Sequence, residues 1–320
     1  MTRDETLRAA DDWFLHHGLS YFVPERRADV RGALRLRRTV PLVVVVALLA
    51  AGAGVALAWA VGELSAAPAT LIALGLAAVL WYALTALHAR QIVTWALART
   101  FGSLRTLLPM TTRALPLLLL AITFLFINAE MWQVASTLTV GALWLVVVLF
   151  AGLAAAFLLV RLPEEVDRTD DAVDDAFLLR ACRDTPLEEA CRELVEDPET
   201  DPAAYAEVTG YERWNLIIVL MIVQTAQVLV LSLSVFAFLM VFGWLIMTRP
   251  VTDAWLTPDS VSASAALVQV SIFLSAFSGL YLTVSTVTDE AYRAQFFGSV
   301  ERELERAVGV RAVYLALRNG

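Results

Sequence analysis

The sequence contains no lysine, and it has only two cysteines and three histidines among its 320 residues. Two cysteines are too few for a disulfide-rich secreted scaffold. Charged residues make up only 18% of the chain, whereas apolar residues make up 59%, compared with about 45–50% in soluble proteins. This composition excludes a disordered chain, a collagen and an ordinary cytosolic domain, and it predicts an integral membrane protein. All 24 Lys and Arg positions are arginine, and alanine is abundant. Both features are associated with GC-rich genomes and favour a bacterial source.

The short motifs of common catalytic sites are also missing. The sequence has no HExxH, no GxSxG, no glycine-rich phosphate loop and no pair of CxxC motifs. The acidic stretch from Glu164 to Asp175 lacks the glycine and the final glutamate of an EF-hand loop, so a solvated face is the favoured interpretation there. We therefore expect no enzymatic activity, no metal site, no cofactor and no nucleic-acid partner.

Six segments free of Asp, Glu, Lys and Arg are the dominant feature of the sequence. About 20 apolar residues cross about 30 Å of hydrocarbon, and backbone groups in lipid must be satisfied internally, so each segment predicts a spanning helix. The predicted spans are about 39–62, 64–87, 110–130, 134–160, 214–248 and 262–288. The first run begins after residue 38 and is too long for a signal-peptide core, so no signal peptide is expected.

The fifth run, Trp214–Thr248, has 35 residues and is too long for one simple span. At 1.5 Å per residue it would extend about 52 Å, more than tilt usually absorbs. We expect part of 237–248 to protrude, to bend near Gly243 or to run along the outer surface. Two spans would also fit this length, but they would put the chain ends on opposite sides of the membrane.

Arginine decides the orientation. With six spans and both termini in the cytoplasm, 23 of the 24 arginines lie on the cytoplasmic side, as the positive-inside rule requires. The sequence thus predicts an all-α, polytopic membrane protein with six transmembrane helices and cytoplasmic N and C termini, in the plasma (inner) membrane of a bacterium.

Basic residues gather next to the predicted spans. Residues 1–38 form an amphipathic, basic N-terminal segment, and residues 39–161 form a four-helix membrane region with an interfacial helix at 88–109. Arginines at such positions attract anionic lipid headgroups. The alternative is that they only fix the topology. The candidate headgroup-binding residues are Arg35, Arg37, Arg38, Arg90, Arg99 and Arg105.

The segment 162–213 differs in charge from the rest of the chain. It carries 17 acidic residues and five arginines, a net charge of −12, whereas the whole chain has −8. We interpret it as a small cytoplasmic cap that presents an acidic surface to a protein partner, and its two cysteines, Cys182 and Cys191, as reduced thiols. The tail 289–320 predicts an amphipathic helix that docks on this segment, on the membrane or on a second copy, and packing within the protomer is favoured.

Polar residues inside hydrocarbon are costly and are therefore the best pointers to function. Gln224 and Gln227 are neighbours on the fifth span, and serines recur every seven residues on the sixth. The sequence offers two interpretations, a polar path or a packing seam with interhelical hydrogen bonds. The candidate lining residues are Gln224, Gln227, Ser234, Gln269, Ser271, Ser275 and Ser278. Glu63 and Glu130 are outer acidic candidates that would shape cation access, or else simple exposed loop acids.

Four stretches resemble integral membrane proteins of unassigned function from GC-rich, Gram-positive bacteria of actinobacterial type: Trp13–Pro24 (WFLHHGLSYFVP), Thr123–Trp132 (TFLFINAEMW), Arg161–Asp167 (RLPEEVD) and Gln295–Leu317. The resemblance implies a plasma-membrane location and transfers no functional residue. Two hypotheses follow. The first is an oligomeric channel or transport protein with its path along spans five and six. The second is a membrane scaffold or regulator that presents 162–213 and the tail to cytoplasmic partners.

Overall fold

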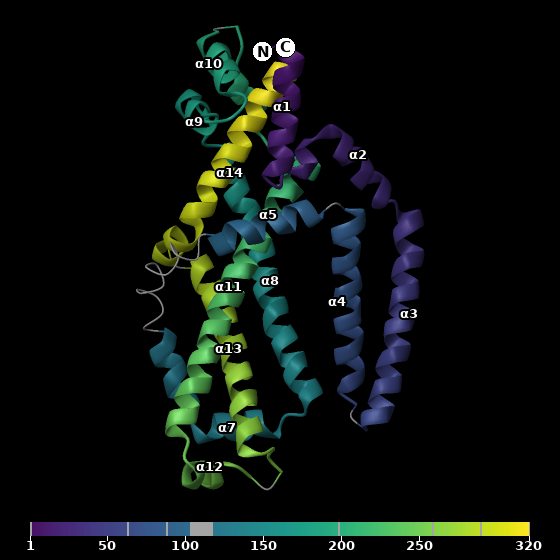
Figure 1. Ribbon diagram of the computed structural model, residues 1–320, viewed down its shortest axis with the longest axis vertical. Coiled ribbons are helices and arrows are strands. Elements are labelled where there is room, and N and C mark those ends of the chain that lie inside the picture. The colour runs from purple at the N-terminus through teal and green to yellow at the C-terminus, as the bar shows by residue number, and fades with distance from the viewer. Residues whose placement is uncertain are drawn as a thin grey trace.

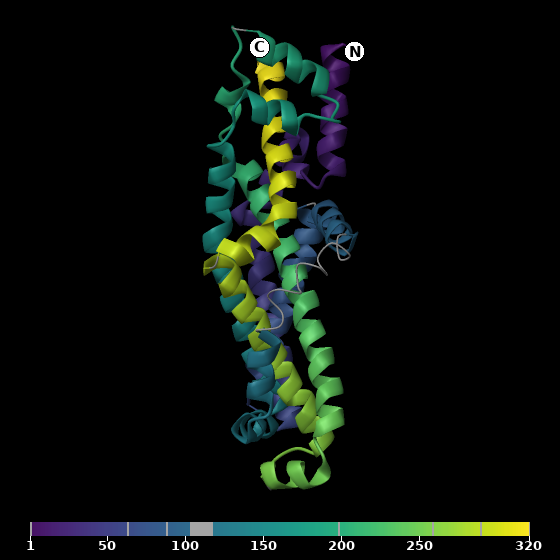
Figure 2. The ribbon, with the colours of Figure 1, turned by 90° about the vertical axis from the view of Figure 1, so that its left-hand side faces the viewer.

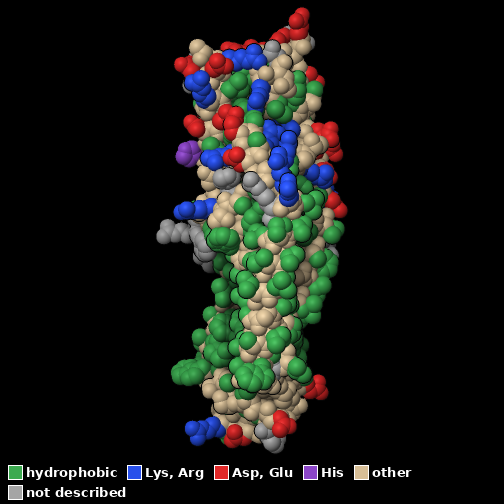
Figure 3. Space-filling model, turned by 90° about the vertical axis from the view of Figure 1, so that its right-hand side faces the viewer, with side chains coloured by type: hydrophobic (Ala, Val, Ile, Leu, Met, Phe, Trp, Pro, Cys, Tyr) green, Lys and Arg blue, Asp and Glu red, His purple; other side chains and the backbone are tan. Residues whose placement is uncertain are grey.

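The computed structural model describes residues 2–62, 64–87, 89–102, 118–197, 199–257, 259–288 and 290–319, and within these ranges the chain contains helices and no strand. The helices form one elongated body with both chain ends at the same tip (Figure 1). Figure 3 shows hydrophobic side chains over the lower part of this body and charged side chains around the end that carries the termini. We call that end the cap and the opposite tip the far end.

Long apolar helices fill the lower part. Five helices in the described ranges are long and apolar enough to cross a membrane, or six if one bent pair counts as a span. The prediction of an all-α membrane protein is therefore confirmed in this coarser form. The five are α3 (Leu36–Val61), α4 (Ala66–Ala86), α8 (Val140–Asp170), α11 (Gly210–Ile246) and α13 (Ala263–Thr288).

The predicted spans 110–130 and 134–160 differ from the structure at their junction. A helix over Leu118–Phe126 ends at an extended Asn128, and α7 (Ala129–Thr137) leaves at 74° to it. Two side chains stabilise this break: Asn128 Oδ1 accepts the backbone N–H of Glu130 at 2.8 Å, and Trp132 Nε1 donates to the carbonyl of Phe126 at 2.8 Å. The start of the predicted third span lies outside the described residues, and residues 134–137 belong to α7 rather than to the fourth span.

Helix α11 is continuous from Gly210 to Ile246, with no break in the helix at Gly243. Its first turns lie in the cap, where Glu212 and Asn215 bond other segments. Gly243 is buried, and a Cβ on it would lie 2.3 Å from Leu267 and 2.8 Å from Phe126. Near the cap, α11 packs on η1 (Ser20–Phe22) and α5 (Ala89–Gly102). The short helix α12 (Arg249–Trp255) then closes the far end (Figure 2).

The spans are packed unevenly. Helices α8, α11 and α13 form a central bundle, in which half of the most apolar window of α13 is buried, whereas the corresponding window of α4 has no buried residue. Helices α3 and α4 pack mainly on each other as a hairpin, with Gly54 so close to the Ala67 carbonyl that a Cβ would lie 2.7 Å from it. The hairpin therefore exposes most of its surface to its surroundings.

The cap unites segments from both ends of the chain. It contains α1 (Arg3–His16), α2 (Pro24–Ala33), α9 (Asp175–Ala181), α10 (Glu188–Glu196), η2 (Pro202–Tyr205) and the end of α14 (Glu290–Asn319). Helix α14 packs on α9 and η2, so the tail docks on the acidic segment of its own chain. A Cβ on Gly309 would lie 2.4 Å from that of Ala181, which shows how closely α14 and α9 approach.

Candidate functional site

Three of the four serines of the predicted path form hydrogen bonds within their own helices. Ser275 Oγ donates to the carbonyl of Ile272 at 2.9 Å, and Ser278 Oγ donates to that of Leu274 at 2.7 Å. Ser234 Oγ bonds the Val230 carbonyl and is exposed on the outside of the bundle. These hydroxyls thus satisfy themselves locally and form no polar chain between α11 and α13.

The glutamines of the predicted path are buried but separated along the bundle. Gln224 and Gln227 lie on the cap half of α11, whereas Gln269 lies near the far end, where its Nε2 donates to the Leu138 carbonyl at 3.2 Å. Five buried side-chain atoms in the described part of the chain have no hydrogen-bond partner: Arg161 Nε and, among the predicted lining residues, Gln224 Nε2, Gln227 Oε1, Gln269 Oε1 and Ser271 Oγ. The structure therefore buries six of the seven predicted lining residues, all except Ser234, and distributes them along the bundle.

A crevice of about 390 Å³ lies between α8, α11 and α13. Its walls include Phe150, Ala154, Val228 and Leu280, with Ser275 as the one lining residue that the sequence singled out. Because the walls are largely apolar, ordered water has few partners there. In the described part of the chain, this crevice is a gap between hydrophobic helices and not a continuous polar path.

The predicted charged candidates lie at the two ends of the spans. Arg35, Arg37 and Arg90 are exposed near the cap-side ends of α3, α4 and α5, and Glu130 is exposed in the first turn of α7 at the far end. Glu63 and Arg105 lie outside the described residues, and the side chains of Arg38 and Arg99 do as well.

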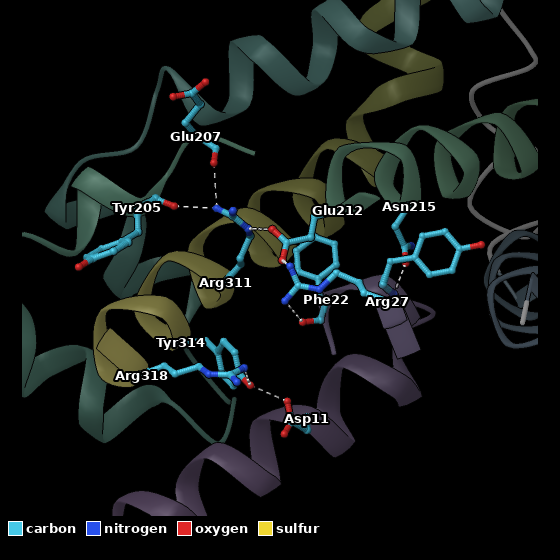
Figure 4. Close-up of polar contacts among 11 residues, drawn as sticks. Asp11, Phe22, Arg27, Tyr205, Glu207, Glu212, Asn215, Arg311, Tyr314 and Arg318 are labelled. Atoms are coloured by element: carbon cyan, nitrogen blue, oxygen red, sulfur yellow. Dashed lines mark hydrogen bonds and ion pairs between the residues drawn. The ribbon is translucent and has the colours of Figure 1, made fainter. Parts of the chain in front are cut away.

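The strongest polar site is an ionic junction in the cap that centres on Glu212, in the first turn of α11 (Figure 4). Glu212 is only 4% exposed. One of its carboxylate oxygens lies 2.7 Å from Arg27 Nη1 of α2, and the other accepts from Arg311 Nε of α14 at 2.5 Å. Arg311 Nη1 also donates to the carbonyls of Tyr205 and Glu207, at 2.7 and 3.0 Å. One buried carboxylate thus joins α2, α11, α14 and the end of the acidic segment.

Asn215 lies one turn further along the same face of α11 and is fully buried. Its Oδ1 accepts the backbone N–H of Tyr21 at 2.7 Å, and its Nδ2 donates to the carbonyl of Gly18 at 3.0 Å. Gly18 has a φ of +71°, which favours glycine, at the turn that ends α1. A single amide therefore satisfies two backbone groups of the N-terminal segment and holds its turn against α11.

Tyr314, one turn after Arg311, ties α14 to α1. Its hydroxyl donates to Asp11 Oδ1 at 2.9 Å and accepts from Arg318 Nη1 at 3.3 Å. Burial raises the pKa of the Asp11 carboxyl and, together with the hydrogen bond to Asp11, raises the pKa of Tyr314 to about 12. The tyrosine hydroxyl is thus a stable donor at neutral pH.

Sequence reasoning grouped Glu212 with the other acids and missed this junction. The sequence did contain two signals. Glu212 and Asn215 are three residues apart at the start of a long apolar run, and Arg311, Tyr314 and Arg318 share one helix face.

The two cysteines of the acidic segment, Cys182 and Cys191, are buried free thiols. Within the described ranges, no group of three His, Cys, Asp or Glu residues is placed to hold a metal ion.

Comparisons of this chain with family models, curated proteins and solved structures found no match. Its function is therefore inferred from its own geometry. That geometry offers a tightly bonded cap, a bundle with a largely apolar crevice and an exposed apolar hairpin.

Proposed function

We propose that this chain is a membrane-embedded scaffold, which holds a folded cap at one membrane surface and presents the acidic face of that cap to protein partners. The observation that carries the proposal is the Glu212 junction, because it joins the N-terminal segment, the acidic segment and the tail to a membrane helix. Buried ions are costly unless they are paired, so a paired network favours one arrangement of these segments over others.

The length of α11 supports this proposal. The helix has 37 residues, which span about 55 Å at 1.5 Å per residue, whereas the hydrocarbon core is about 30 Å thick. Its remaining length reaches into the cap and carries Glu212 and Asn215. The cap therefore continues a membrane helix directly and does not hang on a flexible linker.

The surface charge of the cap indicates the kind of partner. The acidic segment has a net charge of −12, and many of its carboxylates are exposed on the end of α8 and on α9 and α10. A basic protein surface would complement it, and such complementarity speeds encounter and rejects wrong partners. Placing this end in the cytoplasm follows the arginine asymmetry of the sequence, and the bacterial plasma membrane is part of the same proposal.

Charge-neutralised variants of α10 would test the scaffold role. Glu189, Glu193 and Glu196 are exposed, so replacing all three with Gln leaves the core of the cap intact. After purification from cells without cross-linking, proteins bound to the cap should be absent from this variant, and salt should release them from the wild type. The control is Glu130→Gln with Asp253→Gln, two exposed acids of the far end. Identical partner sets from both variants would contradict the proposal.

A transport function is the second candidate, and one observation favours it. Buried polar atoms without partners, such as Gln227 Oε1 and Gln224 Nε2, are costly in a bundle unless they serve a purpose. Ion or solute flux into proteoliposomes should then exceed background for the wild type and fall for Gln227→Leu. Flux at background level for the wild type would eliminate this candidate, and it would leave the scaffold proposal untouched.

A further inference from the structure

A second cavity, of about 470 Å³, lies between α2 and the start of α11. Its walls are almost entirely apolar and aromatic. They include Tyr21, Val30, Leu34, Leu87, Tyr211 and Trp214. Two hydrogen bonds hold this region together, from Tyr21 Oη to the Leu87 carbonyl and from Tyr82 Oη to the Ala33 carbonyl, both at 2.8 Å. The cavity is thus framed by ordered elements.

The position of this cavity along the spans is informative. Helix α3 begins at Leu36, α4 ends at Ala86, and the uncharged run of α11 begins at Trp214. Three membrane helices thus begin or end beside it, which places it at the boundary between hydrocarbon and headgroups. Tyrosine and tryptophan are enriched at that level of a membrane because they have an apolar body and a polar edge. Leu34 is 45% and Leu36 76% exposed, as suits side chains that face lipid.

Positive charge borders the same cavity. The Arg31 guanidinium lies 5.8 Å from the centre of the Tyr211 ring, a cation–π contact against one of the cavity walls. Arg35 and Arg37 follow on either side of the start of α3 and are exposed. Among the described residues, none of these three arginines forms an ion pair with a carboxylate, in contrast to Arg27, which is bound to Glu212. Arg31 therefore offers a guanidinium group beside a wall of the cavity, and Arg35 directly follows the lining residue Leu34.

We propose that this cavity binds one anionic phospholipid, with its phosphate at Arg31 and Arg35 and the first part of its acyl chains against Tyr21, Val30 and Trp214. A free phosphate ion would use only the rim, whereas a lipid fills the apolar walls as well. A neutral lipid would leave the guanidinium groups without a counter-charge. This site is independent of the scaffold function, and each stands if the other fails.

Native mass spectrometry of the full chain, released from detergent micelles with added phosphatidylglycerol or phosphatidylcholine, tests this site. The wild type should retain phosphatidylglycerol in preference to phosphatidylcholine. Arg31→Gln and Arg35→Gln should each lower the retention of phosphatidylglycerol by about fivefold, the effect expected from one basic residue near a membrane surface. Arg31→Lys keeps the charge and should retain most of the preference.

The matched control is Arg249→Gln, an exposed arginine at the start of α12, which lies at the far end and outside the cavity. It should leave the preference unchanged, and an equal loss would show a diffuse charge effect and overturn the site. Ile218→Trp, which projects a larger side chain into the cavity, should lower the retention of both lipids. Full retention in this variant, or displacement of the lipid by millimolar inorganic phosphate, would also overturn the proposal.

Discussion

Buried polar side chains behave differently in the cap and in the membrane bundle. In the cap, Arg311 bonds Glu212 across 99 residues of sequence, and Asn215 bonds Tyr21 across 194. In the bundle, Ser278 bonds a carbonyl four residues away on its own helix, and Gln227 leaves its carbonyl oxygen unpartnered. The cap therefore uses polar groups to specify which segments meet, whereas the bundle uses small and apolar side chains to pack.

The physical setting explains this difference. Lipid is as apolar as the helix surfaces, so helices in a membrane associate through close packing of small residues and gain little from hiding apolar area. A cap in water must hold short helices together, and buried charges without partners would destabilise it. The contacts of Gly279 with Ser232 and of Gly309 with Ala181 show that close packing occurs in both regions. Among the described residues, the buried ion pairs of Glu212 with Arg27 and Arg311 distinguish the cap, since Gln269 of the bundle also bonds a distant carbonyl, that of Leu138.

Replacement of Glu212 by alanine should have the largest effect. It leaves Arg27 and Arg311 without their shared carboxylate, and removing one partner of a buried ion pair typically costs about 3–5 kcal/mol. We expect a lower melting temperature of the detergent-solubilised protein, followed by tryptophan fluorescence, and faster proteolysis of the N-terminal segment. Glu164→Ala is the control, because Glu164 is 53% exposed in its pair with Arg161 and such pairs contribute about 0–1 kcal/mol. Equal losses of stability in Glu212→Ala and Glu164→Ala would show that the buried ion pair of the cap contributes no more than the exposed one.

Asn215→Leu should have the next largest effect. The leucine leaves the Tyr21 N–H and the Gly18 carbonyl buried without partners, at about 1–3 kcal/mol for each group. Hydrogen exchange at Tyr21 should rise together with the loss of thermal stability. Asn128→Ala is the matched control, since this exposed asparagine bonds a neighbouring N–H only, and loss of a helix cap costs about 1 kcal/mol. Unchanged exchange at Tyr21 in Asn215→Leu would refute the role assigned to this amide.

Alkaline pH should loosen the cap before the bundle. The pKa of Tyr314 is about 12 in the folded protein, whereas an unperturbed tyrosine ionises near pH 10. Between these values the unfolded chain releases a proton that the folded chain keeps, so the stability of the cap falls as the pH rises. Tyr314→Phe should abolish this part of the pH dependence in proteolysis experiments on the cap. The same slope in the variant would mean that other groups cause it.

The smallest effects are expected in the bundle. Ser278→Ala removes a bond within one helix and should change the melting temperature by the equivalent of less than about 1 kcal/mol, as is usual for hydrogen bonds in membrane proteins. Gln227→Leu removes an unpartnered carbonyl and should leave stability unchanged or raise it. A large loss of stability in Ser278→Ala or Gln227→Leu would show that polar side chains stabilise the bundle.

Particular residues show where prediction from the sequence succeeded and where it stopped. The long uncharged runs identify α3, α4, α8, α11 and α13 because hydrocarbon requires length and apolarity, and both properties are local. The break at Asn128 was missed because an uninterrupted apolar run masked a helix cap. Nothing in the apolar run of α11 itself shows that this helix packs on η1 and α5.

The candidate site was the least predictable part. Gln227 and Ser234 are seven residues apart and so lie on one side of α11. Gln227 is nevertheless buried and Ser234 exposed, because the neighbouring helices decide which part of that side is covered. Arg31 was one basic residue among many until the fold placed it over Tyr211. Long-range neighbours of this kind depend on topology and have no signature in a single sequence.

By itself, the sequence determined that the chain is apolar, helical and suited to a membrane, because these properties follow from composition and from runs of residues along one helix. The tertiary structure alone decided that Glu212 joins Arg27 to Arg311. It also decided that Tyr21 of η1 and Tyr211 and Trp214 of α11 line one cavity beside Arg31. Each of these results depends on which distant segments meet. That choice is made by packing the whole chain, and no local pattern encodes it.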